Sequence, residues 1–195
     1  IIMGILKPTG GKIYLDGVDI TDMSVTDRAK NGISFAFQQP VKFKGITVTD
    51  LIEIASGKKL SVSEICKYLS EVGLCARDYV NREVNGSLSG GELKRIEIAV
   101  TLARGSKFTI FDEPEAGIDL WSFNSLISVF EKLAEDHSES ILIISHQERI
   151  LNIADRIIVI ADGKVAKDGL KEEVLPNILS ASSACAILEN KVKEA

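Results

Sequence analysis

The sequence predicts an α/β protein built on a parallel sheet, and three short apolar runs carry this prediction. Ile33–Phe37, Phe108–Phe111 and Ile141–Ile144 are β-prone, and segments with helical spacing separate them. The third run is continuously apolar, which is typical of a parallel strand buried on both faces. Ligands of open α/β sheets bind at the carboxyl ends of the strands. A functional site is therefore expected at that edge of the sheet.

Length, composition and charge narrow the class of protein. The 195 residues suffice for one domain or a core plus a subdomain, and 45% hydrophobic with 26% charged residues is ordinary for a globular chain. A net charge of -5 provides no basic field for general nucleic-acid binding. The chain has no apolar run near the roughly 20 residues of a membrane helix and no opening signal peptide, which predicts a cytoplasmic protein. Cys66, Cys75 and Cys185 lack metal-type spacing and are expected to be reduced and mostly buried.

The first forty residues are expected to form small elements around one strand. Ile1–Leu6 resembles the end of a helix, and Asp16-Gly17 between two β-prone runs predicts a hairpin. Ser24–Lys30 fits a short helix. After the strand at Ile33–Phe37 come Gln38, Gln39 and Pro40, and the proline forces the chain to leave the sheet.

A polar helical region follows. The pattern predicts helices over Asp50–Ala55 and Ser63–Val72, ended by Gly57 and Gly73. The lysines between them, Lys58 and Lys59, are expected in a solvated loop.

The run Leu88-Ser-Gly-Gly-Glu92 opens the next helix, which extends to Arg104. Ser89, Gly90 and Gly91 are expected to leave backbone N–H groups free at the helix start, where the helix dipole favours a phosphate. Glu92 lies in the first turn, where its negative charge is stabilised. The helical spacing predicts a buried stripe, with Lys94, Arg95 and Glu97 in water. The stripe consists of Leu93, Ile96, Val100 and Ala103.

Two adjacent carboxylates end the central strand. Asp112 and Glu113 suit different tasks, since one can hold Mg²⁺ through water while the other polarises an attacking water. After Gly117-Ile-Asp119, Asp119 can cap a helix that keeps one apolar face. His146 follows the strand at Ile141–Ile144 and is expected at the same edge as Asp112.

The C-terminal region is expected to hold a hairpin and a helix. Asp162-Gly163 predicts the second hairpin of the chain, and residues 169–195 are expected to be helical and charged, with an interruption at Pro176.

Each of these motifs has a structural alternative when taken alone. A Ser-Gly-Gly run is usually a loop, an Asp-Glu pair is usually a cap or turn, and a lone histidine is usually structural. Their ordered combination is far less common by accident.

In that combination the chain resembles the ABC ATPases. Leu88–Glu92 resembles the signature motif, Phe108–Glu113 the Walker B strand with its glutamate, and Gly117–Asp119 the D-loop. Gln38 is similar to the Q-loop glutamine, with Gln39 a weaker candidate, and His146 to the switch histidine. The resemblance implies a P-loop NTPase (RecA-like) core with an inserted ABC α-helical subdomain. It implies core residues 1–45 and 105–195 around a helical subdomain at 46–104.

The resemblance also implies a mechanism. ATP and Mg²⁺ would bind between two copies of the chain arranged head to tail, with Asp112 and Gln38 toward the metal. Glu113, His146 and Gln38 would act in catalysis. The nucleotide of the other copy would meet the signature and the D-loop, which the family pattern assigns here to Ser89, Gly90, Gly91, Glu92 and Asp119.

The Gly-rich loop that cradles the β- and γ-phosphates in this family is absent from the 195 residues. It is expected upstream of Ile1, so the chain alone is expected to bind ATP poorly and not to turn it over.

Three roles remain open at this stage. Short segments, Ala36–Val41 with Gly45, Gly91–Arg95 with Glu97, and His146–Asn152, are similar to the ATPase of the SUF iron–sulfur assembly system, which implies SUF-type scaffold partners. That role is preferred. The alternative is the ATPase of a membrane transporter with a transmembrane partner, which Pro114-Glu115 and the ordinary Asp162-Gly163 hairpin suit equally well. A non-enzymatic scaffold is the third role.

Overall fold

A computed structural model of the chain describes residues 1–135 and 139–179, and these fall into two compact units that meet between Ser145 and His146 in the sequence. The first unit holds a parallel sheet in the order β3 (Ile33–Ala36), β4 (Phe108–Asp112), β5 (Ser140–Ile144). Ala36 lies opposite Phe111, and Asp112 lies opposite Ile144. The α/β prediction is confirmed, and the strands end together at one edge.

The prediction that β5 is buried on both faces is wrong. Its residues are half-buried to exposed, and Ile144 is 49% exposed. Within the described residues β5 pairs only with β4 and so forms an edge of this sheet. A continuous apolar run identified the strand correctly but not its position in the sheet.

The N-terminal region follows the predicted order except at its start. β1 (Tyr14–Leu15) and β2 (Val18–Asp19) form the hairpin, with Asp16 and Gly17 at φ 50° and 78°, and α1 (Val25–Lys30) begins at the Ser24 cap. Residues 1–6 form turns instead of a helix end. The carbonyls of Ile1 and Ile2 accept hydrogen bonds from the buried guanidinium of Arg28, at 2.8 and 2.7 Å, instead of from helical N–H groups.

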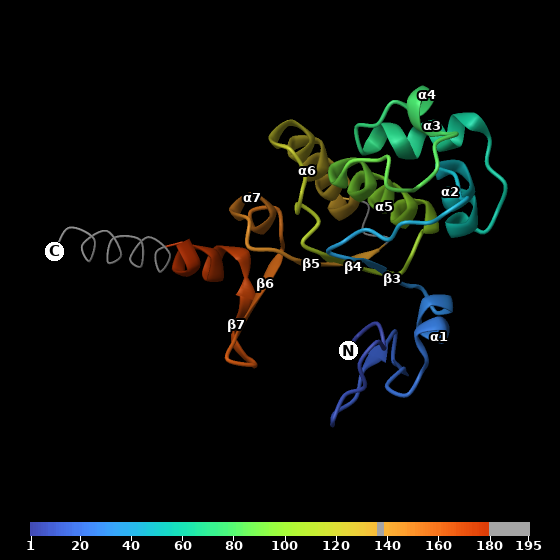
Figure 1. The fold of residues 1–195 in the computed structure, drawn as a ribbon. Helices are drawn as coiled ribbons and strands as arrows, with labels where there is room; N and C mark the ends of the chain where they lie inside the picture. Colours follow the sequence, from blue (N-terminus) through green and yellow to red (C-terminus); the bar gives the residue numbers. More distant parts are fainter. Residues whose placement is uncertain (136–138, 180–195) are drawn as a thin grey trace, which may run out of the picture. The chain divides into compact units, whose positions relative to one another are not determined.

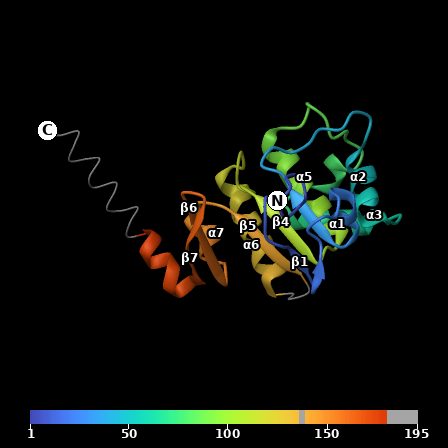
Figure 2. The same ribbon diagram turned by 90° about the horizontal axis from the view of Figure 1, so that it is seen from below.

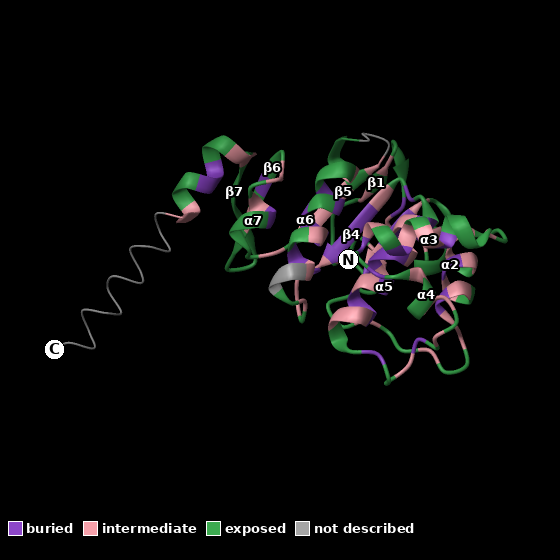
Figure 3. Ribbon diagram, turned by 90° about the horizontal axis from the view of Figure 1, so that it is seen from above, coloured by how far each residue is buried: buried purple, intermediate pink, exposed green. Residues whose placement is uncertain are grey.

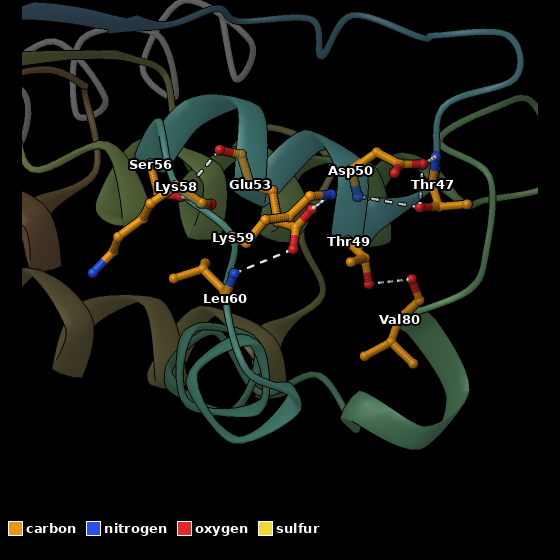
Figure 4. Close-up of polar contacts among 9 residues, drawn as sticks. All are labelled: Thr47, Thr49, Asp50, Glu53, Ser56, Lys58, Lys59, Leu60 and Val80. Atoms are coloured by element: carbon orange, nitrogen blue, oxygen red, sulfur yellow. Dashed lines mark hydrogen bonds and ion pairs between the residues drawn. The ribbon is translucent and has the colours of Figure 1, made fainter.

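Three helices form the region between β3 and the signature run: α2 (Val48–Ser56), α3 (Val62–Glu71) and the unpredicted short α4 (Ala76–Tyr79). The prediction of two helices closed by glycines is confirmed, since Gly57 adopts φ 70° just after α2 and Gly73 adopts φ 70° after α3. Thr47 and Ser61 cap α2 and α3 through capping boxes. Lys59 is exposed, and it donates to the carboxylate of Glu53 on α2 at 2.6 Å (Figure 4).

Helix α5 (Gly90–Arg104) packs on α2, α3 and β3, so it joins the helical region to the sheet (Figures 1 and 2). Its buried stripe includes the predicted Leu93, Ile96 and Ala103, and α6 (Leu120–Glu135) likewise buries Phe123 and Phe130. The placement of Lys94 and Glu97 in water is wrong, because the Lys94 side chain is completely buried and the Glu97 side chain is only 16% exposed. Figure 3 shows buried positions along α5 and β4.

The second unit contains α7 (Glu148–Leu151) and a hairpin of β6 (Arg156–Ala161) and β7 (Lys164–Leu170). The Asp162-Gly163 turn is confirmed, with φ 50° and 71°. Residues 171–179 are helical, so the predicted helix begins two residues later than expected and continues through Pro176. The predicted helix from 180 to 195 lies outside the described residues.

The cysteine prediction is partly wrong. Cys66 is half-buried and Cys75 is exposed, both as free thiols, and Cys185 lies outside the described residues. Among the described residues, no helix is long and apolar enough to cross a membrane.

Candidate functional site

The carboxyl ends of β3 and β4 bring together two of the predicted site residues. The Nε2 of Gln38 donates a hydrogen bond of 2.5 Å to Oε2 of Glu113. Glu113 has φ 44°, and its N–H donates to the carbonyl of Ile144 at 2.9 Å. Positive φ is uncommon for residues other than glycine and clusters at functional sites. The strand ends thus hold an amide and a carboxylate in direct contact.

Asp112 ends β4, half-buried, one residue before this pair. Within the described residues, no group of three His, Cys, Asp or Glu side chains could hold a metal ion by itself. A site with one carboxylate and one amide oxygen fits Mg²⁺, which is usually bound by one or two carboxylates together with phosphate oxygens and waters. Asp112 and the amide oxygen of Gln38 are the groups that would hold it.

Glu115 belongs to this edge and was missed by the sequence reasoning. The hydroxyl of Ser145 donates to its Oε1 at 2.5 Å, and its Oε2 is buried without a hydrogen-bond partner. Buried carboxylate oxygens are normally hydrogen-bonded, so this one is an exception. Nothing in the local sequence distinguishes Glu115 from an exposed loop residue, because its burial depends on the chain near Ser145.

The start of α5 is a capping box. The Ser89 hydroxyl accepts from the Glu92 N–H at 3.2 Å, and the Glu92 carboxylate accepts from the Ser89 N–H at 2.6 Å. The first helical bond runs from the Leu93 N–H to the Ser89 carbonyl at 3.0 Å. The prediction of three free N–H groups is therefore too broad, since Ser89 uses its own. Those of Gly90 and Gly91 precede the helical bonding pattern and can meet an anion.

Two residues before the signature hold Glu92, Tyr79 at the end of α4 and Arg82 in the loop that follows, and sequence reasoning missed both. Tyr79 donates its hydroxyl to Oε1 of Glu92 at 2.5 Å, and Arg82 lies 3.3 Å from the same oxygen. The Arg82 guanidinium also lies 5.1 Å from the centre of the Tyr79 ring. The Tyr79 hydrogen bond, followed by those from Ser89, lowers the pKa of Glu92 to about 2. Glu92 is thus held ionised and fixed in position at the start of the signature helix.

Gly91 allows the signature to approach the D-loop. A β-carbon at Gly91 would lie 3.1 Å from the carbonyl oxygen of Gly117, tighter than ordinary contact. Asp119 caps α6, since its carboxylate accepts from the N–H and the hydroxyl of Ser122 at 3.0 and 2.7 Å. The two motifs are therefore neighbours within one chain.

His146 is exposed and is the first residue of the second unit. Its predicted location beside Asp112 stays a prediction.

Comparisons with known proteins identify the family of this chain. The family model described as ABC transporter matches residues 1–116. An uncharacterized ABC transporter ATP-binding protein of Methanocaldococcus jannaschii is 39% identical over 89% of this chain and 72% of its own length. The chain belongs to the ABC transporter family of ATP-binding proteins.

Two relatives with more specific names are also similar. The thiamine import ATP-binding protein ThiQ of Shigella flexneri is 30% identical, covering 96% of this chain and 81% of its own length. The energy-coupling factor transporter ATP-binding protein EcfA2 of Clostridium acetobutylicum is 33% identical over 91% of this chain. This chain spans 64% of the length of that relative.

Solved structures share the fold. An ATP-binding cassette of an ABC transporter, MJ1267, superposes with a TM-score of 0.75 at 28% identity, covering 96% of this chain and 80% of that one. A dimeric cassette in a post-hydrolysis state with ADP and Pi gives 0.76 at 23% identity, covering 87% of this chain and 77% of that one. The fold is that of ABC ATPase cassettes, the P-loop NTPase fold, as predicted.

Proposed function

We propose that this chain is the catalytic part of an ATP-hydrolysing subunit that drives a membrane transporter. The observation that carries the proposal is the contact between Gln38 and Glu113 at the ends of adjacent parallel strands. A carboxylate held there by an amide suits the orientation of a water for attack on a phosphate. Membership of the ABC family supports ATP as the substrate.

In the proposed mechanism, Glu113 accepts a hydrogen bond from the attacking water, which takes up the place beside Gln38. Asp112 and the amide oxygen of Gln38 would hold Mg²⁺, which when bound would neutralise negative charge at the phosphates. Ser89 and the N–H groups of Gly90 and Gly91 contact the nucleotide of a second copy in a head-to-tail homodimer. His146 is proposed to reach the γ-phosphate, and Asp119 the nucleotide side of the dimer interface.

The transporter role replaces the iron–sulfur assembly role as the preferred function. The relatives named above carry transporter names, including thiamine import and energy-coupling factor transport. The segments similar to the SUF ATPase are short, and these comparisons do not single them out. The proposed partner is therefore a transmembrane transporter subunit, with the ATPase on the cytoplasmic side.

The 195 residues contain no Gly-rich phosphate loop, so the test joins a segment that carries one to the chain. With that segment joined to the chain, Glu113→Gln should lower ATP hydrolysis by roughly 100-fold or more, because a general base contributes on that order. ATP binding should be retained, and the variant should accumulate as an ATP-bound dimer in size-exclusion chromatography. Hydrolysis at the parent rate would contradict the role of Glu113.

Partner identity is tested by affinity purification of the full-length protein from separated membrane and soluble fractions. The transporter role expects a polytopic membrane protein in detergent extracts. Substituting Lys42 and Lys44, both exposed beside the Q-loop, should weaken this association while ATP affinity stays unchanged. Lys58, exposed in the helical region, provides a matched control substitution. Recovery of soluble iron–sulfur assembly proteins instead would favour the other role.

A further inference from the structure

Lys94 is the feature of α5 that the proposed mechanism leaves unexplained. Its side chain has no solvent exposure, although it lies in the second turn of a helix whose start is at the surface. A buried ammonium is costly unless charged or polar groups surround it. The burial of a lysine at this position therefore requires an explanation in terms of the groups that it contacts.

The groups around Lys94 come from three segments of the chain. Its Nζ lies 3.3 Å from the carboxylate of Glu97, one turn further along α5. It also donates to the backbone carbonyl of Phe37 and lies 3.5 Å from the carbonyls of Gln38 and Asp112. One ammonium thus joins the signature helix to the ends of β3 and β4.

Glu97 makes a second contact from α5 to the backbone just before Gln38. Its Oε1 accepts the N–H of Phe37 at 3.0 Å, while Lys94 takes the carbonyl of the same residue. β3 ends at Ala36, so the sheet does not hold this residue. Helix α5 therefore replaces the missing strand partner at the position just before Gln38.

We propose that Lys94 and Glu97 are positioning residues that hold Gln38 and Glu113 in register with the signature helix. The proposal rests on the proposed function. Besides the Phe37 carbonyl, Lys94 contacts the carbonyl of Gln38 itself and that of Asp112, whose peptide group leads into Glu113. Because α5 is a continuous helix from Gly90, a shift of the signature on meeting nucleotide moves Lys94 and, with it, both members of the pair.

A purely structural role for Lys94 makes a different prediction. A buried ion pair is weak evidence for stability, and uncharged groups of similar volume often replace one without loss. A structural role therefore expects the neutral pair Lys94→Met with Glu97→Gln to fold and to work. A positioning role expects it to fold and to hydrolyse slowly.

The test uses the full chain with its phosphate-loop segment and compares steady-state ATP hydrolysis. For the double variant we expect kcat to fall by roughly 10- to 100-fold, the scale of a small misplacement of reacting groups, while the KM for ATP stays within about twofold. The matched control is Lys59→Met with Glu53→Gln. It removes a lysine–glutamate contact in which Glu53 lies on α2 and the exposed Lys59 lies in the loop after it, and it should leave kcat unchanged.

Three outcomes decide the proposal. A double variant with parental kcat overturns it, as does a fall in kcat that Lys59→Met with Glu53→Gln reproduces. If the double variant does not fold, Glu97→Gln alone is measured, because it keeps an acceptor for the Phe37 N–H, and parental kcat in that variant also overturns the proposal. Glu113→Gln is measured alongside, since parental hydrolysis in that variant would refute the proposed function itself.

Discussion

Glu92 and Glu97 lie five residues apart on the same helix, and their surroundings are opposite. Glu92 is 19% exposed and accepts hydrogen bonds from Tyr79 and Ser89, which lower its pKa to about 2. Glu97 has one oxygen buried without a hydrogen bond, and burial raises its pKa despite Lys94 at 3.3 Å. The first turn of α5 is stabilised by satisfied hydrogen bonds, whereas the second bears a desolvated ion pair. Within two turns, one helix thus holds a glutamate whose charge stabilises the fold and another whose burial opposes its ionisation.

The largest expected effect on stability comes from removing one partner of the buried pair Lys94 and Glu97. Lys94→Ala should destabilise the chain by about 3–5 kcal/mol, because it leaves the Glu97 carboxylate buried without its partner. Urea unfolding followed by circular dichroism measures this. The paired substitution Lys94→Met with Glu97→Gln should cost far less, and an equal loss in both would contradict the account of an uncompensated charge.

The pH dependence of stability should separate the two glutamates. Because the pKa of Glu92 is about 2 when folded against an ordinary 4.5, its stabilisation is present above pH 4.5 and is lost as the pH falls toward 2. Tyr79→Phe removes the largest cause and should cost roughly 1–3 kcal/mol at pH 7 and much less near pH 2.

Glu97 should show the opposite sign. Its raised pKa means that the folded state prefers the protonated carboxyl, so this group lowers stability as the pH rises from its ordinary value through the raised one. Glu97→Gln should remove that slope in urea titrations repeated between pH 4 and pH 8. Identical slopes in Tyr79→Phe and Glu97→Gln would show that the contrast between the two glutamates is wrong.

The capping box at the helix start should have a smaller effect. Ser89→Ala should cost about 1 kcal/mol, as removal of a helix cap usually does. Ser61→Ala of α3 is the matched control, because the same capping box occurs there with Glu64. Thermal unfolding should give similar losses for both, while only Ser89→Ala should weaken ATP-dependent dimerisation of the chain that carries a phosphate loop. Equal dimerisation in both variants would show that Ser89 does not contact the nucleotide.

The smallest effect is expected at the exposed counterpart of Lys94. Lys59 is 90% exposed and contacts Glu53 at 2.6 Å. Lys59→Met should change stability by less than about 1 kcal/mol, because the Lys59 ammonium stays in water and such ion pairs gain little, although the Glu53 carboxylate is only 12% exposed. Chemical denaturation beside Lys94→Ala measures the difference, and comparable losses would mean that burial does not set the cost.

Elements held by near neighbours could be predicted from the sequence, whereas contacts across the sheet could not. The Asp16-Gly17 and Asp162-Gly163 turns, the Ser24 cap and the glycine after α2 depend on residues within a few positions. The short α4 was missed because its cap, Cys75, provides no side-chain hydrogen bond. The end of a helix predicted at Ile1–Leu6 failed because Arg28, more than twenty residues away, takes the carbonyls there.

The sequence by itself determined the motifs, their order and the strand ends that carry Gln38, Asp112 and Glu113. It also determined the capping box of Ser89 with Glu92, because both partners lie within one helical turn. Only the tertiary structure decided that Lys94 is buried, that Tyr79 and Arg82 hold Glu92, and that Gln38 meets Glu113, 75 residues apart. Helical spacing assigns Lys94 to a polar face, and the carbonyls that make its burial tolerable come from segments 57 residues before and 18 after it. Local hydrogen bonds are encoded by adjacent side chains, whereas desolvation depends on which distant segments pack against them.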